Sequence, residues 1–223
     1  MLCADLCMGT GVEASDRRPI AARNLGATQR LAAALVARGA SPNGISVAGM
    51  VAGLAAGLAF AATAWLPGAA WVLWLLGALL VQARLMANLL DGMVAIGRGV
   101  ASPVGELFNE VPDRVSDTAV LVGLGVAAGS PAWGLAAALA AMLTAYIRTT
   151  ARAAGAPSDF GGPMAKQHRM ALATGLAVWC AVVPGVWGGA MAVWVVLVVI
   201  TLGSVLTAWL RLSRAAAALR AKP

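Results

Sequence analysis

The stretch from Asn88 to Asp117 reads Asn88-Leu-Leu-Asp91-Gly-Met-Val-Ala-Ile96, a short linker, then Gly105-Glu-Leu-Phe-Asn109-Glu-Val-Pro-Asp113-Arg-Val-Ser-Asp117. It holds five of the nine acidic residues of the chain, although long apolar runs lie on both sides of it. Ionisable groups at the meeting point of two hydrophobic runs are costly, and they usually mark a functional site. We therefore look for the function of the chain in this stretch.

The spacing of these polar residues predicts two oxygen-rich helix faces. Because each residue of a helix advances by ~100°, one acidic face lies within a sector of roughly 100° around Asn109 and gathers Glu106, Glu110, Asp113 and Asp117. Asn88 and Asp91 are three residues apart and share a second face. Together the two faces would form an oxygen-lined pocket of the kind that suits magnesium, manganese or calcium. The spacing alone leaves a solvated acidic loop open as the alternative.

The same positions resemble the signature of the CDP-alcohol phosphatidyltransferase family. That signature reads Asp, two residues, Asp-Gly, two residues, Ala-Arg, eight residues, Gly, three residues, Asp, three residues, Asp. Every spacing is present, and the matching positions are Asn88, Asp91, Gly92, Ala95, Ile96, Gly105, Asn109 and Asp113. The chain departs from the pattern at the first and third aspartates, which are Asn88 and Asn109, and at the arginine, which is Ile96. It is identified as a variant member of the family.

The resemblance implies that an alcohol hydroxyl, free or on a phosphorylated acceptor, attacks the lipid-attached phosphate of a CDP-diacylglycerol-type donor and releases CMP. It implies a divalent cation, magnesium or manganese, held at Asn88, Asp91 and Asn109, and a general base with metal contact at Asp113. Glu106 and Glu110 are expected to restore part of the negative charge that the asparagines remove. The resemblance assigns substrate binding to small positions near the cytidine, Gly92, Ala95 and Gly105, and we add Asp117 from the acidic face.

A basic cluster, Lys166-Gln-His168-Arg169, stands before the fifth apolar run. Lysine and arginine hold phosphate well, so we expect Lys166 and Arg169 to bind the phosphate of the acceptor or of the lipid donor. Anchoring of a membrane helix by positive charge is the alternative. His168 is a candidate proton carrier near neutral pH or a solvated loop residue.

Composition indicates a membrane protein, because 61% of the 223 residues are hydrophobic, 11% are charged and the mean hydropathy is +0.83. Six apolar runs predict an all-α, polytopic protein with six transmembrane helices, since backbone groups in lipid must be satisfied within the helix. The runs cover residues 45–66, 70–90, 105–128, 131–150, 171–184 and 188–210. The fifth is long enough to cross only if its helix begins near Gln167.

The chain divides into four predicted parts. Residues 1–16 are expected to be a disordered N-terminus, and residues 17–40 an amphipathic helix on an anionic membrane surface, with an ordinary solvated helix as the alternative. Residues 41–212 form the six-helix domain, and residues 213–223 a basic cytoplasmic tail. Cys3, Cys7 and Cys180 have no spacing that predicts a disulfide or a zinc site.

Orientation follows from charge. The connections 67–70, 129–130 and 185–187 carry no charged residue, and the lysines and arginines are assigned to the other connections and the termini. The positive-inside rule then places both termini and the acidic site on the cytoplasmic side, with the bacterial inner membrane as the expected location. An interfacial aromatic belt is expected beside the uncharged connections, at Trp65, Trp71, Trp133 and Trp187.

Gly49, Gly53 and Gly57 recur every four residues and allow close helix approach, either within one subunit or in a homodimer. Three classes of function fit the sequence. The first is an active lipid phosphotransferase, and the second is a catalytically inactive homologue that binds a CDP-lipid or a partner enzyme. A transporter is third. Membrane lipids are expected around the chain, and no nucleic-acid partner is expected.

Overall fold

The computed structural model describes residues 25–100, 103–183 and 189–221, and within them every regular element is a helix. The elements are α1 (Gly26–Ala37), α2 (Pro42–Ala62), the short 3-10 helix η3 (Pro67–Ala69), α3 (Ala70–Gly97), α4 (Pro103–Ala127), α5 (Pro131–Ala153), α6 (Lys166–Val182) and α7 (Ala190–Arg220). The predicted all-α class is confirmed. The expected disorder of residues 1–16 and the first part of the expected N-terminal helix lie outside the described residues.

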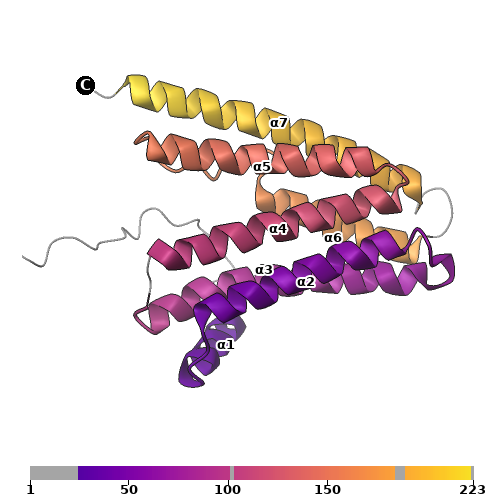
Figure 1. Ribbon diagram of the computed structural model, residues 1–223, viewed down its shortest axis with the longest axis horizontal. Coiled ribbons are helices and arrows are strands. Elements are labelled where there is room, and N and C mark those ends of the chain that lie inside the picture. The colour runs from indigo at the N-terminus through magenta and orange to yellow at the C-terminus, as the bar shows by residue number, and fades with distance from the viewer. Residues whose placement is uncertain (1–24, 101–102, 184–188, 222–223) are drawn as a thin grey trace, which may run out of the picture.

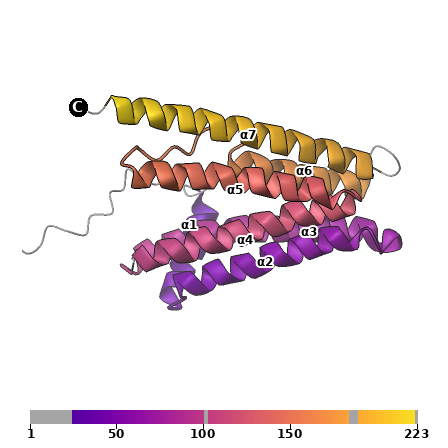
Figure 2. The ribbon, with the colours of Figure 1, turned by 45° about the horizontal axis from the view of Figure 1, so that its top comes forward.

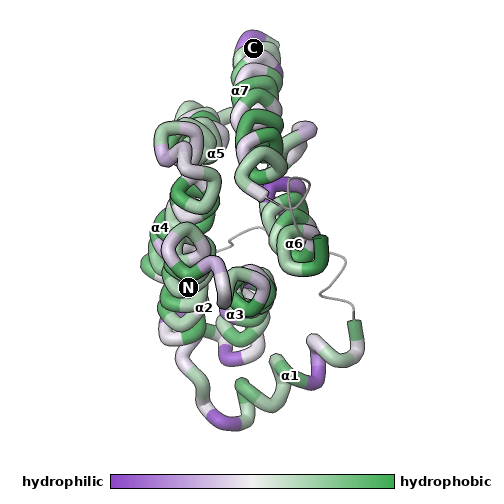
Figure 3. The backbone as a smooth tube through the Cα atoms, turned by 90° about the vertical axis from the view of Figure 1, so that its right-hand side faces the viewer, coloured by the Kyte–Doolittle hydropathy of each residue, from purple (hydrophilic) through white to green (hydrophobic). Residues whose placement is uncertain are grey.

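The long helices α2, α3, α4, α5 and α7 run side by side along one axis (Figures 1 and 2). Helix α2 packs against α3 and α4, α5 packs against α4 and α7, and the shorter α6 packs chiefly against α3. Helix α1 lies beside α3 near one end of the bundle (Figure 1), and its axis runs across that of the bundle (Figure 3). The segment 213–220, expected to be a basic tail, continues α7 as helix.

Four described helical segments are long and apolar enough to cross a membrane: Pro42–Ala62, Pro67–Gly97, Pro131–Ala153 and Ala190–Arg220. Helix α4 is long but carries several charges, and α6 has 17 residues and begins at Lys166. The coarser prediction of an integral membrane protein agrees with the four candidate spans. Six spans stay a prediction.

The outer surface of the bundle is apolar. Leu58, Leu79, Leu139, Leu202 and Trp209 are each more than 60% exposed. Soluble proteins rarely expose large contiguous apolar patches, so this surface suits contact with lipid.

The glycines of α2 bring the backbones of α2 and α4 together. A Cβ added to Gly57 would lie 2.3 Å from the carbonyl oxygen of Ala119, and one added to Gly53 would lie 2.5 Å from the Cβ of Ser116. Gly49 faces Ala87 of α3 in the same way. The stripe therefore packs helices within one chain.

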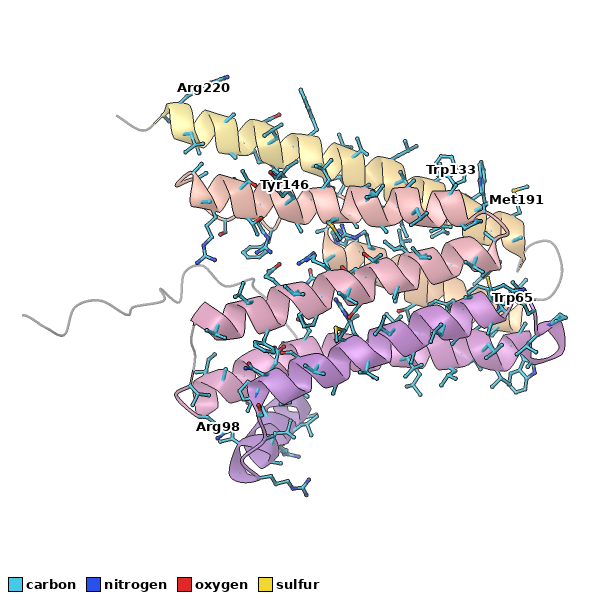
Figure 4. The ribbon with its side chains drawn as sticks, in the orientation of Figure 1. Trp65, Arg98, Trp133, Tyr146, Met191 and Arg220 are labelled. Atoms are coloured by element: carbon cyan, nitrogen blue, oxygen red, sulfur yellow. The ribbon has the colours of Figure 1, made fainter. Side chains whose placement is uncertain are left out.

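The two ends of the bundle differ in composition. Trp65 and Trp133 lie at one end, whereas Arg98 and Arg220 lie at the other (Figure 4). The expected Trp187 lies outside the described residues. The assignment of every basic residue to connections and termini is wrong for three arginines, because Arg84, Arg114 and Arg148 lie within the apolar runs 70–90, 105–128 and 131–150, which form parts of α3, α4 and α5. Each of the three has an acidic partner within the bundle.

Candidate functional site

A small pocket, partly open to the surroundings, lies between α2, α3 and α4. All four positions that match the aspartates of the signature line it: Asn88 and Asp91 from α3, and Asn109 and Asp113 from α4. Helix α2 contributes Ser46, Gly49 and Met50, and the lining is completed by Arg84, Pro112 and Ser116. Asn109 and Asp113 of the predicted acidic face therefore meet the face that carries Asn88 and Asp91.

Asp91 is 4% exposed and is held by neutral donors. Its Oδ2 accepts a hydrogen bond of 2.7 Å from the hydroxyl of Ser46, and its Oδ1 accepts one of 2.6 Å from the backbone amide of Gly92. A carboxylate oxygen has more than one acceptor site, so each oxygen keeps capacity for a further ligand. These contacts fix the orientation of Asp91 and leave its charge available.

Asp113 is 8% exposed and is held by two cations. Nη2 of Arg84 donates to its Oδ1 at 2.8 Å and to its backbone carbonyl at 3.0 Å. The ammonium of Lys166 donates to its Oδ2. Asp113 thereby ties α3 and α6 to α4, and its negative charge is compensated inside the bundle.

Asp117 lies one helical turn below Asp113 and is also buried. Its Oδ1 is 2.7 Å from Nη2 of Arg84, and its Oδ2 is 3.9 Å from Nη2 of Arg169. Both contacts are ionic, because neither carboxylate oxygen receives a hydrogen bond within the described part of the chain. Asp117 belongs to the charged network beneath the pocket and does not line the pocket.

The acidic face of α4 divides in two. Glu110 turns toward α5, and its Oε1 accepts a hydrogen bond of 2.5 Å from Arg148 of that helix. Its Oε2 accepts one of 2.8 Å from Arg114, one turn further along α4. The structure therefore does not bring Glu110 to the pocket. The side chain of Glu106 lies outside the described residues. Glu110 faces away from the pocket in part because it pairs with Arg148 of α5. The spacing of residues within α4 could not predict this contact with another helix.

The basic cluster also divides. Lys166 and Arg169 are buried, and Nη1 of Arg169 donates to the carbonyl of Met164 at 2.8 Å. His168 is exposed and does not line the pocket. Of the small positions, Gly92 meets no atom within 4 Å at an added Cβ, and neither Ala95 nor Gly105 lines the pocket.

The loop before α6 is pinned to α7, and this places Lys166 and Arg169. Arg211 donates through Nε to the carbonyl of Gly161 at 2.9 Å, and the amide of Met164 donates to Thr207 at 2.9 Å. Gly162 has φ +120°, and an added Cβ would lie 2.4 Å from Thr207. Only glycine fits such a backbone without strain.

Asp159 stabilises the same loop at the surface. Its Oδ1 accepts from the amide of Gly161 at 2.7 Å, and its Oδ2 accepts from Arg214 at 3.1 Å. Burial raises the pKa of Asp159, but the Gly161 amide and the Arg214 guanidinium outweigh it and hold the pKa below its usual value. Asp159 is therefore charged at neutral pH.

Sequence reasoning missed Arg84 and Ser46 as pocket residues. The signal for Arg84 was present, since it is a lone charge within the apolar run 70–90, and such residues mark sites by default. Ser46 carried no comparable signal. Among the described residues, no group of three or more His, Cys, Asp and Glu side chains is placed to hold a metal ion.

These features define a helical protein with four candidate membrane spans in its described part and an oxygen-lined pocket next to an internal ion-pair network. No family model matches the chain. The phosphatidylinositol phosphate synthase of Mycobacteroides abscessus is 29% identical to it over 179 residues, which cover 77% of each protein.

Solved structures of the phosphatidylinositol phosphate synthase of Mycobacterium tuberculosis have the same fold. The structure with CDP-DAG bound has a TM-score of 0.70 and 23% identity, and the match covers 84% of this chain and 92% of that one. The complex with manganese and citrate has the same TM-score and identity, with 84% and 88% covered. These homologues belong to the CDP-alcohol phosphatidyltransferase family, which agrees with the resemblance carried by the spacing of the site.

Proposed function

We propose that this chain is an integral-membrane phosphotransferase of phospholipid biosynthesis, which transfers a phosphatidyl group from a CDP-linked lipid to an alcohol and releases CMP. One observation carries the proposal: the four positions with the signature spacing, two on α3 and two on α4, line a single pocket. The curated relative is a phosphatidylinositol phosphate synthase, and a structure of the same fold holds CDP-DAG. Both support a CDP-diacylglycerol-type donor.

The relative also suggests the acceptor. Its name makes inositol phosphate the first acceptor to test, and a phosphorylated alcohol suits the two buried cations Lys166 and Arg169. Glycerol 3-phosphate, serine and a second lipid are the other acceptors to compare.

The residues of the pocket fit one divalent cation. Asp91 offers a carboxylate whose described contacts are all neutral, and Asn88 and Asn109 add amide oxygens beside it. Magnesium and manganese prefer oxygen ligands of this kind, and a homologue of the same fold was solved with manganese. Such a cation would supply charge stabilisation for the diphosphate and for the CMP that leaves.

Asp113 is proposed to accept the proton of the attacking hydroxyl. In the structure its Oδ2 is bonded to Lys166, so a phosphate near α6 would have to draw the ammonium away before Oδ2 could act as a base. This assigns Lys166 two roles, which are neutralising Asp113 in the resting site and binding the acceptor phosphate. Arg169 and His168 stay predicted substrate contacts, as do Gly92, Ala95, Gly105 and Asp117.

A second function is supported by the same site. Asn88 and Asn109 replace acidic positions of the signature, and both oxygens of Asp113 are occupied by cationic side chains. A catalytically inactive protein that binds a CDP-lipid, or a partner of a lipid-synthesis enzyme, would have these properties.

For the membrane, we propose that α4 and α6 cross with the four candidate spans and that α1 lies on the surface at the charged end. The long axis of α4 follows those of α2, α3 and α5 (Figure 1), and its Asp113 and Glu110 pair with arginines of neighbouring helices. The positive-inside rule places the charged end, both termini and the site in the cytoplasm. The bacterial inner membrane and a homodimer stay predictions.

The experiment that tests the function is CMP release from CDP-diacylglycerol by the purified protein, with each acceptor in turn and with magnesium, manganese or a chelator. Asp91→Asn should lower the rate about 100-fold or more, because it removes the free carboxylate that would hold the cation. Asp159→Asn is the matched control, since it makes the same chemical change outside the pocket.

Lys166→Met should chiefly raise the acceptor concentration needed for half-maximal rate. If the natural protein releases no CMP with any of the acceptors, the reading as a catalytically inactive homologue is favoured. Restoration of turnover by Asn88→Asp together with Asn109→Asp would then show that the chemistry had been lost at these two positions.

A further inference from the structure

Arg84 is a fully buried arginine that also lines the pocket. It lies on α3 one helical turn before Asn88, and its side chain is 2% exposed. Its Nη2 contacts three oxygens: Oδ1 and the carbonyl of Asp113, and Oδ1 of Asp117. The guanidinium of Arg84 thus lies between Asp113 and Asp117 of α4.

The net charge of the pocket lining is small, because Asn88 and Asn109 are neutral and Arg84 is positive. Among the lining residues, Asp91 and Asp113 are acidic and Arg84 is basic, so their formal charges leave one net negative charge. Four aspartates at the signature positions, without an arginine, would carry four. One divalent cation is enough to overcome a single negative charge, and a second would be repelled by both the first ion and the guanidinium.

The guanidinium also has a donor group to spare. Nη2 has two protons, and both of its hydrogen bonds go to Asp113. Nη1 is buried and has no hydrogen-bond partner within the described part of the chain. A buried N–H group without a partner is costly, whereas arginine binds phosphate oxygens with well-directed pairs of hydrogen bonds.

We propose that Arg84 is a built-in cation of this pocket: it holds Asp113 and Asp117 in place, takes the place of a second metal ion, and donates through Nη1 to a diphosphate oxygen of the CDP-lipid. The proposal rests on the proposed function, because the CDP-lipid is its ligand. It makes Arg84 a substrate-binding residue and explains how a site with asparagines at two acidic positions can hold a diphosphate.

The first experiment counts manganese ions without any turnover. The protein in detergent is titrated with manganese, and the free ion is followed by electron paramagnetic resonance. The natural protein should bind one ion per chain. Arg84→Met should bind a second ion, or bind the first at least about tenfold more tightly, because a positive charge beside the carboxylates has gone.

Two further variants separate charge from structure. Arg84→Lys keeps the positive charge but loses the planar guanidinium with its paired N–H donors. It should therefore bind manganese as the natural protein does and bind CDP-diacylglycerol about tenfold more weakly. Arg148→Met is the matched control, because Arg148 and its partner Glu110 both lie outside the pocket lining. It should leave the manganese titration unchanged.

No ion or two ions per natural chain would overturn the proposal, as would a folded Arg84→Met variant with an unchanged titration. If Arg84→Met does not fold, the proposal is tested by the number of manganese ions bound per natural chain and by the affinity of Arg84→Lys for CDP-diacylglycerol. An unchanged affinity of Arg84→Lys for this lipid would exclude the phosphate contact. A failure of the proposed function would give a different result. A chain that binds one manganese ion and the lipid but releases no CMP would retain the role of Arg84 and lose the transfer reaction.

Discussion

Replacing Asp113 by asparagine should destabilise the protein much more than the same change at Asp91. Asp113 accepts from Arg84 and Lys166, and all three side chains are at most 11% exposed. A neutral amide at this position would remove the anion that lies between the two cations, and Arg84 would keep only its ionic contact with Asp117. Among the described residues, Asp91 accepts hydrogen bonds from the hydroxyl of Ser46 and the amide of Gly92, which an amide oxygen can still satisfy in part.

The magnitude follows from the burial of the pair. Removing one partner of a buried ion pair costs about 3–5 kcal/mol. The asparagine carbonyl can still accept from Arg84, so we take the lower end, about 3 kcal/mol. In a chain of this length each kcal/mol shifts the unfolding midpoint by roughly 2–4 °C, and Asp113→Asn should therefore lower the midpoint by roughly 6–12 °C.

The buried thiol of Cys180 provides the assay, because it becomes reactive only when the bundle opens. In a background with Cys3→Ser and Cys7→Ser, a thiol-reactive fluorescent dye follows unfolding in detergent as the temperature rises. Asp159→Asn is the control, since its partner Arg214 is exposed and such pairs contribute about 0–1 kcal/mol. Asp91→Asn should resemble this control.

A midpoint for Asp113→Asn within about 2 °C of the natural protein, on the scale of the expected shift, would refute the reasoning. It would mean that Arg84 and Lys166 find other partners at no cost. An equal loss in Asp91→Asn and Asp113→Asn would show that the two carboxylates differ less than their contacts indicate.

Three further outcomes are expected. Gly57→Ala should lower stability by about 2 kcal/mol, because the new methyl group would meet the backbone of α4; Gly175→Ala, with open space at its Cβ, should be neutral or stabilising in the same dye assay. Cysteines placed at Gly68 and Gly129 should react with a membrane-impermeant reagent only from outside intact cells, and reaction from the cytoplasmic side alone would invert the proposed orientation. Because the pKa of Asp159 is lowered on folding, its stabilising effect is present above its unfolded pKa and lost as pH falls through the folded pKa. The difference in melting temperature between the natural protein and Asp159→Asn should therefore be seen at pH 6 and vanish in strong acid, and a difference that persists there would contradict the assignment.

Helical spacing and hydropathy were enough to predict most of the bundle. Residues 70–90 and 131–150 fall within α3 and α5, and the meeting of Asn88, Asp91, Asn109 and Asp113 follows from their spacing. These features depend on local periodicity, which a single sequence displays. The glycines of α2 likewise predict close approach, although not which helix they contact.

The pairing of charges could not be predicted in the same way. Glu110 and Asp113 lie three residues apart on one helix, yet Glu110 contacts Arg148 on α5 and Asp113 contacts Arg84 on α3. A sector of roughly 100° is wide enough to face two neighbours at once. Which cation each carboxylate meets depends on the packing of other helices, and that information lies far away in the chain.

The close contact of α2 with α4 has a consequence for natural variation in this protein. Met50 and Gly53 are three residues apart, so the helix that forms one wall of the pocket is the one whose distance from α4 the glycines set. Any side chain larger than hydrogen at Gly53 or Gly57 moves that wall relative to Asp113 without touching a single charged residue. Conservative Gly-to-Ala changes one to two turns from the pocket lining are therefore expected to cause loss of function. Mutational screens limited to charged residues would overlook them.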